Sequence, residues 1–241
     1  MAIAMLGEFL TAVHAARASY ATVHARIRYW YDADIFSAVQ AARPRTSSRT
    51  EAALSTRLDS RQPNALDVVL QEIWFKHPRR WRIQTLSLVG PQPLLIVDGD
   101  KWWRWDGLHE AISNEESPEP AAMGGAFDPA LVVTLDPVRL LGELSFAVTG
   151  EDVQAGQVAF RARAIPRDRD ARGLWSGADD YDVLIDRQRG VLLRATARVQ
   201  GREFAGSEVL DITYDEELPD DTFRLELPPG VVVQQAGRGR R

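Results

Sequence analysis

The four histidines are the first side chains to consider for metal or acid–base chemistry. No two of them have the spacing of a motif such as H-E-x-x-H, in which one helical turn brings both imidazoles to one ion. His77 precedes Pro78 at a turn, where a solvated side chain is the simpler interpretation. The chain contains no cysteine, which excludes thiolate ligands, catalytic cysteines and disulfides. We therefore expect no metal site at the histidines, which are His14, His24, His77 and His109.

The adjacent carboxylates Asp179 and Asp180 are the next candidates for catalysis. Neighbouring residues on a strand point to opposite faces, so the two carboxylates cannot converge on one substrate without a bulge. The chain also lacks a G-x-G-x-x-G motif, a phosphate-binding loop and a G-x-S-x-G elbow. We therefore expect no catalytic residue and no cofactor, and we expect that the protein is not an enzyme.

The stretch LLIVDGDKWWRWD, residues Leu94–Asp106, places three tryptophans in four consecutive positions after an Asp-Gly turn signal. Side chains alternate between the faces of a strand, so Trp103 and Trp105 share one face while Trp102 lies with Arg104 on the other. Indoles in such a place can stack on sugars or bases, line an apolar cavity or fill a sheet core. The residues alone leave these alternatives open.

Length and charge limit the classes of protein to which the chain can belong. Its 241 residues are enough for one large domain with a sizeable core, or for two small domains. A net charge of −5 argues against a nucleic-acid partner, whose binding domain normally shows a basic excess. No apolar run approaches the ~20 residues of a transmembrane helix. The N-terminus lacks the basic start of a secretory signal, so we expect a cytoplasmic location.

The elements that would position these residues follow from hydrophobic periodicity. Near the N-terminus, apolar residues at the spacing i, i+3, i+4 and i+7 predict a helix. From Val23 to Tyr31 the period becomes two, as in a half-buried strand. Further strand-like runs are ALDVVLQEIWFK, RRWRIQTLSL, PLLIVDG and KWWRWDG, and His77–Arg80 and Val97–Asp100 read as tight turns between them.

The second half of the chain continues this pattern. Ala111–Gly125 reads as a loop, and DPVRLLGEL predicts a short helix that Asp136 would cap and Pro137 would begin. The last third alternates again, with one hairpin around Asp186–Gly190 and a final strand in DTFRLELPPG. We predict a single domain over residues 1–230, a flexible insertion at 43–64 and a disordered tail at 231–241. An antiparallel sheet with a few helices on one face, an α+β fold, accounts for these pieces.

Several segments resemble the LolA/LolB-like family, which includes outer-membrane lipoprotein carriers and RseB-type regulators. KHPRRWRIQTL resembles the family pattern "kP.rfRi", and LLIVDGDKWWRWDG resembles "vsdGk.lw.Y". DPVRLLGEL resembles the family's short central helix, VLIDRQRGVLLRATARVQG its late hairpin, and YDEELPDDTFRLELPPG its closing strand. The resemblance runs from about Leu6 to Gly230 and rests on the shared order of these motifs.

This resemblance implies a half-barrel, a strongly curved antiparallel sheet whose apolar concave face is covered by helices. It also implies a lipid or acyl chain as the ligand, bound by shape and by apolar burial and without catalysis. Most relatives are exported or lipid-anchored, so the alternative is a cytosolic protein-interaction or regulatory module whose cavity is filled by its own side chains. The residues expected on the concave face are Trp81, Ile83, Trp103, Trp105, Phe160, Val183, Ile185, Val191, Leu193 and Phe223.

Overall fold

The computed structural model describes residues 2–41, 67–87, 90, 92–115, 129–167 and 174–236. The insertion predicted at 43–64 lies outside the described residues, as do residues 237–241 of the predicted tail. Within the described part, no helix combines the length and the apolar character needed to cross a membrane.

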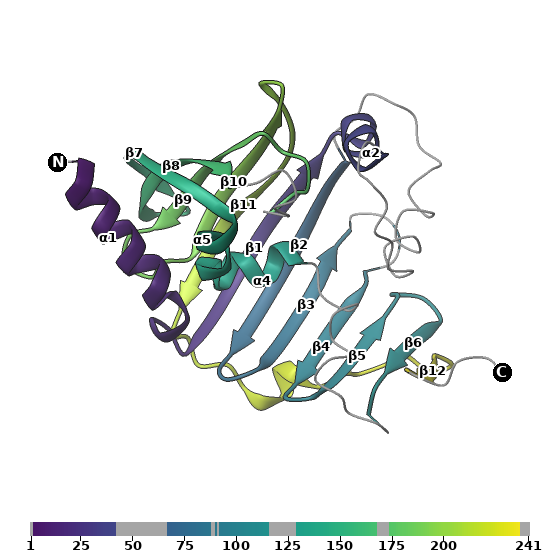
Figure 1. Cartoon of the computed structure of the whole chain (residues 1–241). Coiled ribbons are helices and arrows are strands. Elements are labelled where there is room, and N and C mark those ends of the chain that lie inside the picture. The colour runs from purple at the N-terminus through teal and green to yellow at the C-terminus, as the bar shows by residue number, and fades with distance from the viewer. Residues whose placement is uncertain are drawn as a thin grey trace.

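Twelve strands form one sheet in the order β12-β6-β5-β4-β3-β2-β1-β11-β10-β9-β8-β7. Neighbouring strands are antiparallel except for β12 and β6, which are parallel. The sheet does not close, because β12 and β7 remain its two edges, and Figure 1 shows it curving around the helices as a half-barrel. The strands are β1 (Thr22–Tyr31), β2 (Asp67–Lys76), β3 (Arg80–Leu86), β4 (Leu94–Asp98), β5 (Lys101–Trp105), β6 (Glu110–Ser113), β7 (Leu144–Gln154), β8 (Gln157–Pro166), β9 (Asp180–Asp186), β10 (Leu192–Val199), β11 (Arg202–Tyr214) and β12 (Val232–Gln235).

Short helices connect and cover these strands. The N-terminal helix and the hairpin turns lie where the periodicity predicts them, and the predicted α+β class is confirmed. The helices are α1 (Ala2–Ala15), α2 (Ala33–Ala41), α4 (Pro129–Leu135), α5 (Leu140–Glu143) and the 3₁₀ turns η1 (Ala16–Ala18), η3 (Pro137–Arg139) and η4 (Asp220–Phe223).

The central strand β1 defines the two faces of the sheet. Val23, Ala25 and Ile27 are buried on one face, which we call the inner face, while Arg26 and Arg28 are exposed on the other, the outer face. Directly paired residues on antiparallel strands project to the same side, so the register carries this assignment from β1 across the sheet.

Two hydrophobic clusters make up the core. The helix cluster lies at the β7–β10 end, where α1 packs on β7 and β9. In Figure 1, α1, α4 and α5 lie on this side and over the middle of the sheet, α2 lies at the end of β1 and β2, and none of these helices lies over β4–β6. The helix cluster contains Phe9, Ala12, Val13, Val133, Leu140, Leu144, Phe160, Ala162, Ala164, Ala178, Tyr181, Val183, Ile185, Leu192, Ala195, Ala197, Phe204 and Ala205. The central cluster contains Tyr20, Val23, Ala25, Ile27, Tyr29, Ile73, Phe75, Ile83, Leu95, Val97, Trp102, Leu131, Leu135, Ala159, Leu184, Val191, Leu193, Val209 and Ile212.

Three local predictions are corrected by the structure. The loop predicted over Ala111–Gly125 begins with the end of strand β6, and the tail predicted to be disordered contains β12, which pairs with β6. The strand predicted in DTFRLELPPG is instead the turn η4 followed by irregular chain, in keeping with the proline pair at its end. The helix predicted at DPVRLLGEL is a 3₁₀ turn followed by α5, and the side chain of Asp136 makes no cap.

Candidate ligand-binding face

Two rows of side chains run across the inner face of the strands that lie away from α1. In the first row Val23 of β1 pairs with Phe75, Phe75 with Trp81, Trp81 with Val97, and Val97 with Trp102. Every member of this row belongs to the central cluster or packs against it. The row therefore forms a continuous apolar and aromatic surface over five strands.

The second row lies beside the first and is aliphatic over most of its length. Ile73 pairs with Ile83, and Ile83 pairs with Leu95; all three are buried in the central cluster. The row ends in Arg104 and Ile112, where the apolar surface reaches solvent. Together the two rows present the apolar surface that a hydrocarbon chain requires.

Four of the predicted lining residues lie in or against the central cluster. Ile83, Val191 and Leu193 are buried in it, and half-buried Trp81 packs against it with its ring centroid 4.5 Å from that of Phe75. The structure thus brings these four residues together on one side of the sheet. Their role in ligand binding stays a prediction.

Three other predicted lining residues belong to the helix cluster. Phe160, Val183 and Ile185 are buried there beneath α1, and Phe9 of α1 meets Phe160 edge-on at 6.0 Å between ring centroids. Side chains of this chain therefore fill the concavity at the β7–β10 end. Any room for a ligand must lie toward the central cluster.

The structure places Trp103 and Trp105 on the outer face, opposite to the expected side. Trp103 pairs with Ile96 and Trp105 with Leu94, whereas Val97, which faces the central cluster, pairs with Trp102. The predicted alternation is right, but the side was assigned wrongly. The reason is that Leu94 and Ile96 are also buried, so both faces of β4 are apolar and hydrophobicity alone does not distinguish them.

Phe223 also lies on the outer face. It is part of η4, which packs against β3 and β4, and the guanidinium of Arg80 lies 4.8 Å from the centre of its ring. Arg80 pairs with Asp98 and also binds Asp220 of η4 at 2.6 Å. The segment after β11 is thus held against the back of the sheet, and Phe223 cannot line the inner face.

Two tyrosines give the central cluster polar anchors at the end near α4. Tyr20 donates to the carbonyl of Leu135 at 2.7 Å, and Tyr214 donates to Asp186 Oδ2 at 2.9 Å. Burial, and then the negative charge of Asp186, raises the pKa of Tyr214 well above its ordinary value. Both hydroxyls are therefore protonated at physiological pH. Each already donates its single hydrogen bond within the chain.

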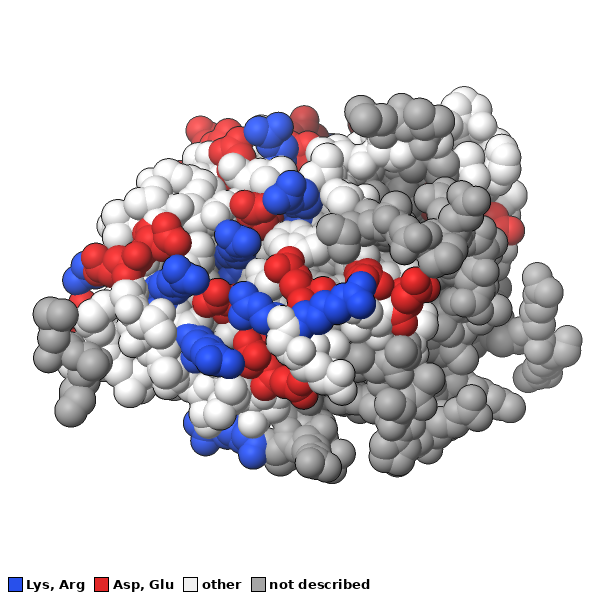
Figure 2. Space-filling model, turned by 90° about the horizontal axis from the view of Figure 1, so that it is seen from above, with Lys and Arg blue, Asp and Glu red and all other residues white. Residues whose placement is uncertain are grey.

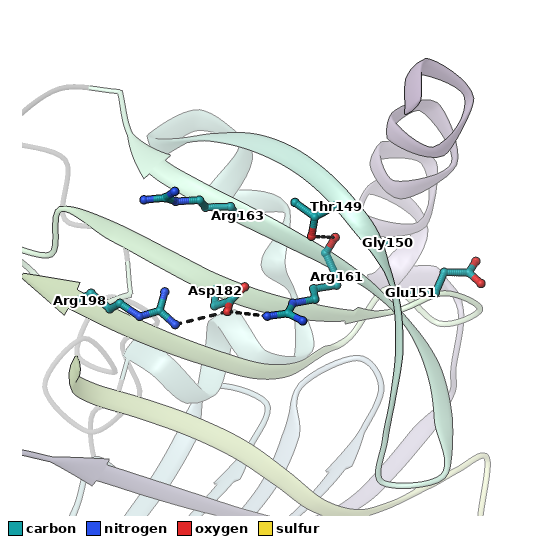
Figure 3. A pocket seen from close by; sticks show the side chains of 7 residues that line it. All are labelled: Thr149, Gly150, Glu151, Arg161, Arg163, Asp182 and Arg198. Carbon is teal, nitrogen blue, oxygen red and sulfur yellow. Dashed lines mark hydrogen bonds and ion pairs between the residues drawn. The ribbon is translucent and has the colours of Figure 1, made fainter. Parts of the chain in front are cut away.

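A hollow of about 460 Å³ lies on the outer face of β7–β10. Figure 3 shows Arg161 and Arg198 reaching Asp182 from two sides, at 3.2 and 3.3 Å, while Glu151 points away from them. Asp180 also binds Arg198 at 3.2 Å and Arg163 at 3.4 Å, so each of these guanidiniums is paired with a carboxylate in a surface ion-pair ladder. The lining residues are Thr149, Gly150, Glu151, Arg161, Arg163, Asp182 and Arg198.

Replacing Asp182 with asparagine tests this ladder. Burial acts to raise the pKa of Asp182, but hydrogen bonds and charges from Arg161 and Arg198 outweigh it and hold the pKa below its usual value. The ionised carboxylate therefore adds stability above the ordinary aspartate range, and this stability is lost as the pH falls through the lowered pKa. We expect Asp182→Asn to cost about 1 kcal/mol at neutral pH and less near pH 2, measured by urea unfolding at both values. An equal cost at both pH values would contradict the ion-pair account.

The described residues form no metal centre, and the face in view in Figure 2 shows no basic patch. Within the described ranges no three His, Asp or Glu side chains are grouped to hold a metal ion. On the face in view in Figure 2, Lys and Arg alternate with Asp and Glu and do not gather into a field of one sign. That face offers no continuous track for a phosphate backbone.

Comparison with known proteins identifies the fold but no close relative. No family model and no curated protein matches the chain. Solved structures do: a crystal structure of MucB matches with TM-score 0.55 and 15% identity, over 94% of this chain and 69% of that one. An uncharacterized conserved protein from Thermus thermophilus matches with TM-score 0.52 and 12% identity, over 96% and 99% of the two chains.

The complex of Pseudomonas aeruginosa MucA and MucB matches with TM-score 0.51 and 15% identity, over 92% of this chain and 66% of that one. The chain thus spans about two thirds of the length of these MucB chains. At such low identity the likeness establishes the fold alone. It confirms that the chain has the LolA/LolB/RseB-like half-barrel fold indicated by the sequence motifs.

Proposed function

We propose that this chain, a half-barrel of LolA-like fold, is a non-enzymatic binding protein that holds a lipid or another apolar ligand against its inner face. One observation carries the proposal. The two apolar rows continue from β1 and β2 to β4 and β5, which lie away from the labelled helices, whereas α1 fills the opposite end and Leu131 and Leu135 of α4 pack in the central cluster. Half-buried Trp81 and Ile112 mark where this apolar surface meets solvent.

Hydrocarbon burial supplies enough free energy for such binding. Each methylene group removed from water contributes about 0.8 kcal/mol, so a twelve-carbon chain gains roughly 10 kcal/mol before the cost of association is subtracted. Aromatic side chains such as Phe75 and Trp81 offer a large contact area with few rotatable bonds. The proposed ligand is therefore selected by its apolar shape.

The first experiment is native mass spectrometry of the protein purified from its own host, followed by lipid extraction. We expect a reproducible bound mass of a lipid, and binding of fluorescent fatty acids after delipidation. A protein that is empty and ignores these probes contradicts the proposal. That result would favour the alternative, a protein-interaction module whose concavity is filled by its own side chains, as the helix cluster already is at one end.

Replacing Trp81 with alanine should separate ligand binding from stability. Because the Trp81 indole is half-buried at the margin of the central cluster, its loss should weaken binding of a fluorescent fatty acid at least tenfold. The matched control is Trp74→Ala: Trp74 is a half-buried indole on the outer face, stacked on His24 at 5.0 Å. The control should lose a similar amount of stability and keep its affinity. Equal affinities for the two variants would place the ligand elsewhere.

A further inference from the structure

The indole nitrogen of Trp102 is a buried hydrogen-bond donor without an acceptor. Trp102 is only 7% exposed, and among the described residues no hydrogen-bond partner lies within reach of its Nε1 atom. Buried donors are nearly always paired in native proteins, because burying an N–H without an acceptor forfeits its hydrogen bond to water. An unpaired donor at a candidate binding face calls for an acceptor that the described residues do not supply.

The position of Trp102 ties this donor to the proposed ligand surface. Its side chain ends the aromatic row of the inner face, directly opposite Val97 and two strands beyond Trp81. The backbone of Trp102 is already paired, since its N–H donates to Asn114 Oδ1 at 2.7 Å and its carbonyl accepts from the Asn114 N–H at 3.2 Å. The strand is therefore held in place while the indole N–H remains unused.

Polar groups in and around the central cluster differ in whether they are paired. The hydroxyls of Tyr20 and Tyr214 both donate to acceptors from this chain. His77, whose ring lies 4.9 Å from that of Phe75, also leaves its buried Nε2 atom without a partner. His77 Nε2 and Trp102 Nε1 are thus unpaired at opposite ends of the aromatic row, and Gln71 Oε1, opposite Ile27 on the inner face, is a third such atom.

From this arrangement we infer that the ligand carries a hydrogen-bond acceptor, the carbonyl oxygen of an acyl group, and that the Trp102 indole N–H donates to it. This inference rests on the proposed function and names the ligand class more narrowly. The hydrocarbon part of the ligand lies along the row of Phe75, Trp81 and Val97. The acyl oxygen then sits at the β5 end of the row, where it satisfies the buried donor.

Two probes test the inference: methyl dodecanoate, which has an acyl oxygen, and 1,6-diphenylhexatriene, a hydrocarbon without one. Trp102→Phe removes the N–H and keeps an aromatic ring. We expect it to weaken methyl dodecanoate binding roughly three- to tenfold, the worth of one neutral hydrogen bond, and to change diphenylhexatriene binding less than twofold. In nitrogen-15 NMR spectra, the indole signal that Trp102→Phe removes should shift with methyl dodecanoate and stay in place with diphenylhexatriene.

The matched control is Trp105→Phe, because the Trp105 indole nitrogen is also buried and unpartnered but belongs to the outer face. It should leave the affinities for both probes unchanged. Equal weakening of both probes by Trp102→Phe, or an unchanged affinity for methyl dodecanoate, overturns the inference while the proposed function stands. If the unaltered protein binds neither probe, the proposed function itself fails.

Discussion

Replacing Gly190 with alanine is expected to destabilise the protein by about 2–5 kcal/mol in urea unfolding. Gly190 lies in the turn between β9 and β10 with φ +70°, a left-handed conformation that costs an alanine free energy. An added Cβ would also lie 2.0 Å from the carbonyl oxygen of Ala12 in α1. Since the carbonyl group of Ala12 is part of the helix backbone, the clash can be relieved only if α1 and the turn move apart.

Gly201→Ala is the matched control for this prediction. Gly201 has a similar φ of +76°, but an added Cβ would meet nothing within 4 Å. The control should therefore show only the cost of the left-handed backbone, on the order of 1 kcal/mol. If both variants lose the same stability, α1 does not dock on the turn as closely as the structure indicates, and the helix cover of the inner face needs revision.

Replacing Phe160 with alanine is expected to cost about 3–5 kcal/mol, the range for truncating a buried phenylalanine. Phe160 is 1% exposed in the helix cluster and packs edge-on against Phe9 of α1. Because this end of the concavity is filled by side chains, a fluorescent fatty acid should bind the folded variant as tightly as the original protein. The measurements are urea unfolding and probe titration at a temperature where the variant is folded.

Ile165→Ala serves as the control on the same strand, since Ile165 is 50% exposed and its truncation should change stability by less than about 0.5 kcal/mol. A small loss for Phe160→Ala, together with a large loss of probe affinity, would contradict the assignment. It would mean that Phe160 lines an open ligand cavity, as its place among the predicted lining residues first suggested.

Much of the fold follows from periodicity and turn chemistry. The alternation in β1 and the Asp-Gly turn between β4 and β5 depend on local backbone preferences, which a short segment expresses by itself. Helices α2 and α4 were not predicted, because each is short and its packing depends on strands far away in the chain. Local patterns thus predict most strands but not the short covering helices.

The candidate site was only partly predictable, and the tryptophans show why. Alternation correctly places Trp102 and Trp103 on opposite faces of the sheet. Deciding which of them lies on the inner face requires knowing which face of β4 the segment around η4 covers. That segment, with Phe223, comes from more than a hundred residues later in the chain. Strand parity is local information, whereas the identity of the buried face is set by tertiary contacts.

The central claim is that an acyl chain lies along the inner face of β2–β4, and residue-level photo-crosslinking tests it most directly. A diazirine-bearing fatty acid should mark alternate residues within one strand, because neighbours point to opposite faces. We predict adducts on Phe75, Trp81 and Ile83 and none on Trp74, Arg82 or Ile96. Adducts confined to the second set, or spread equally over both sets, would contradict the account.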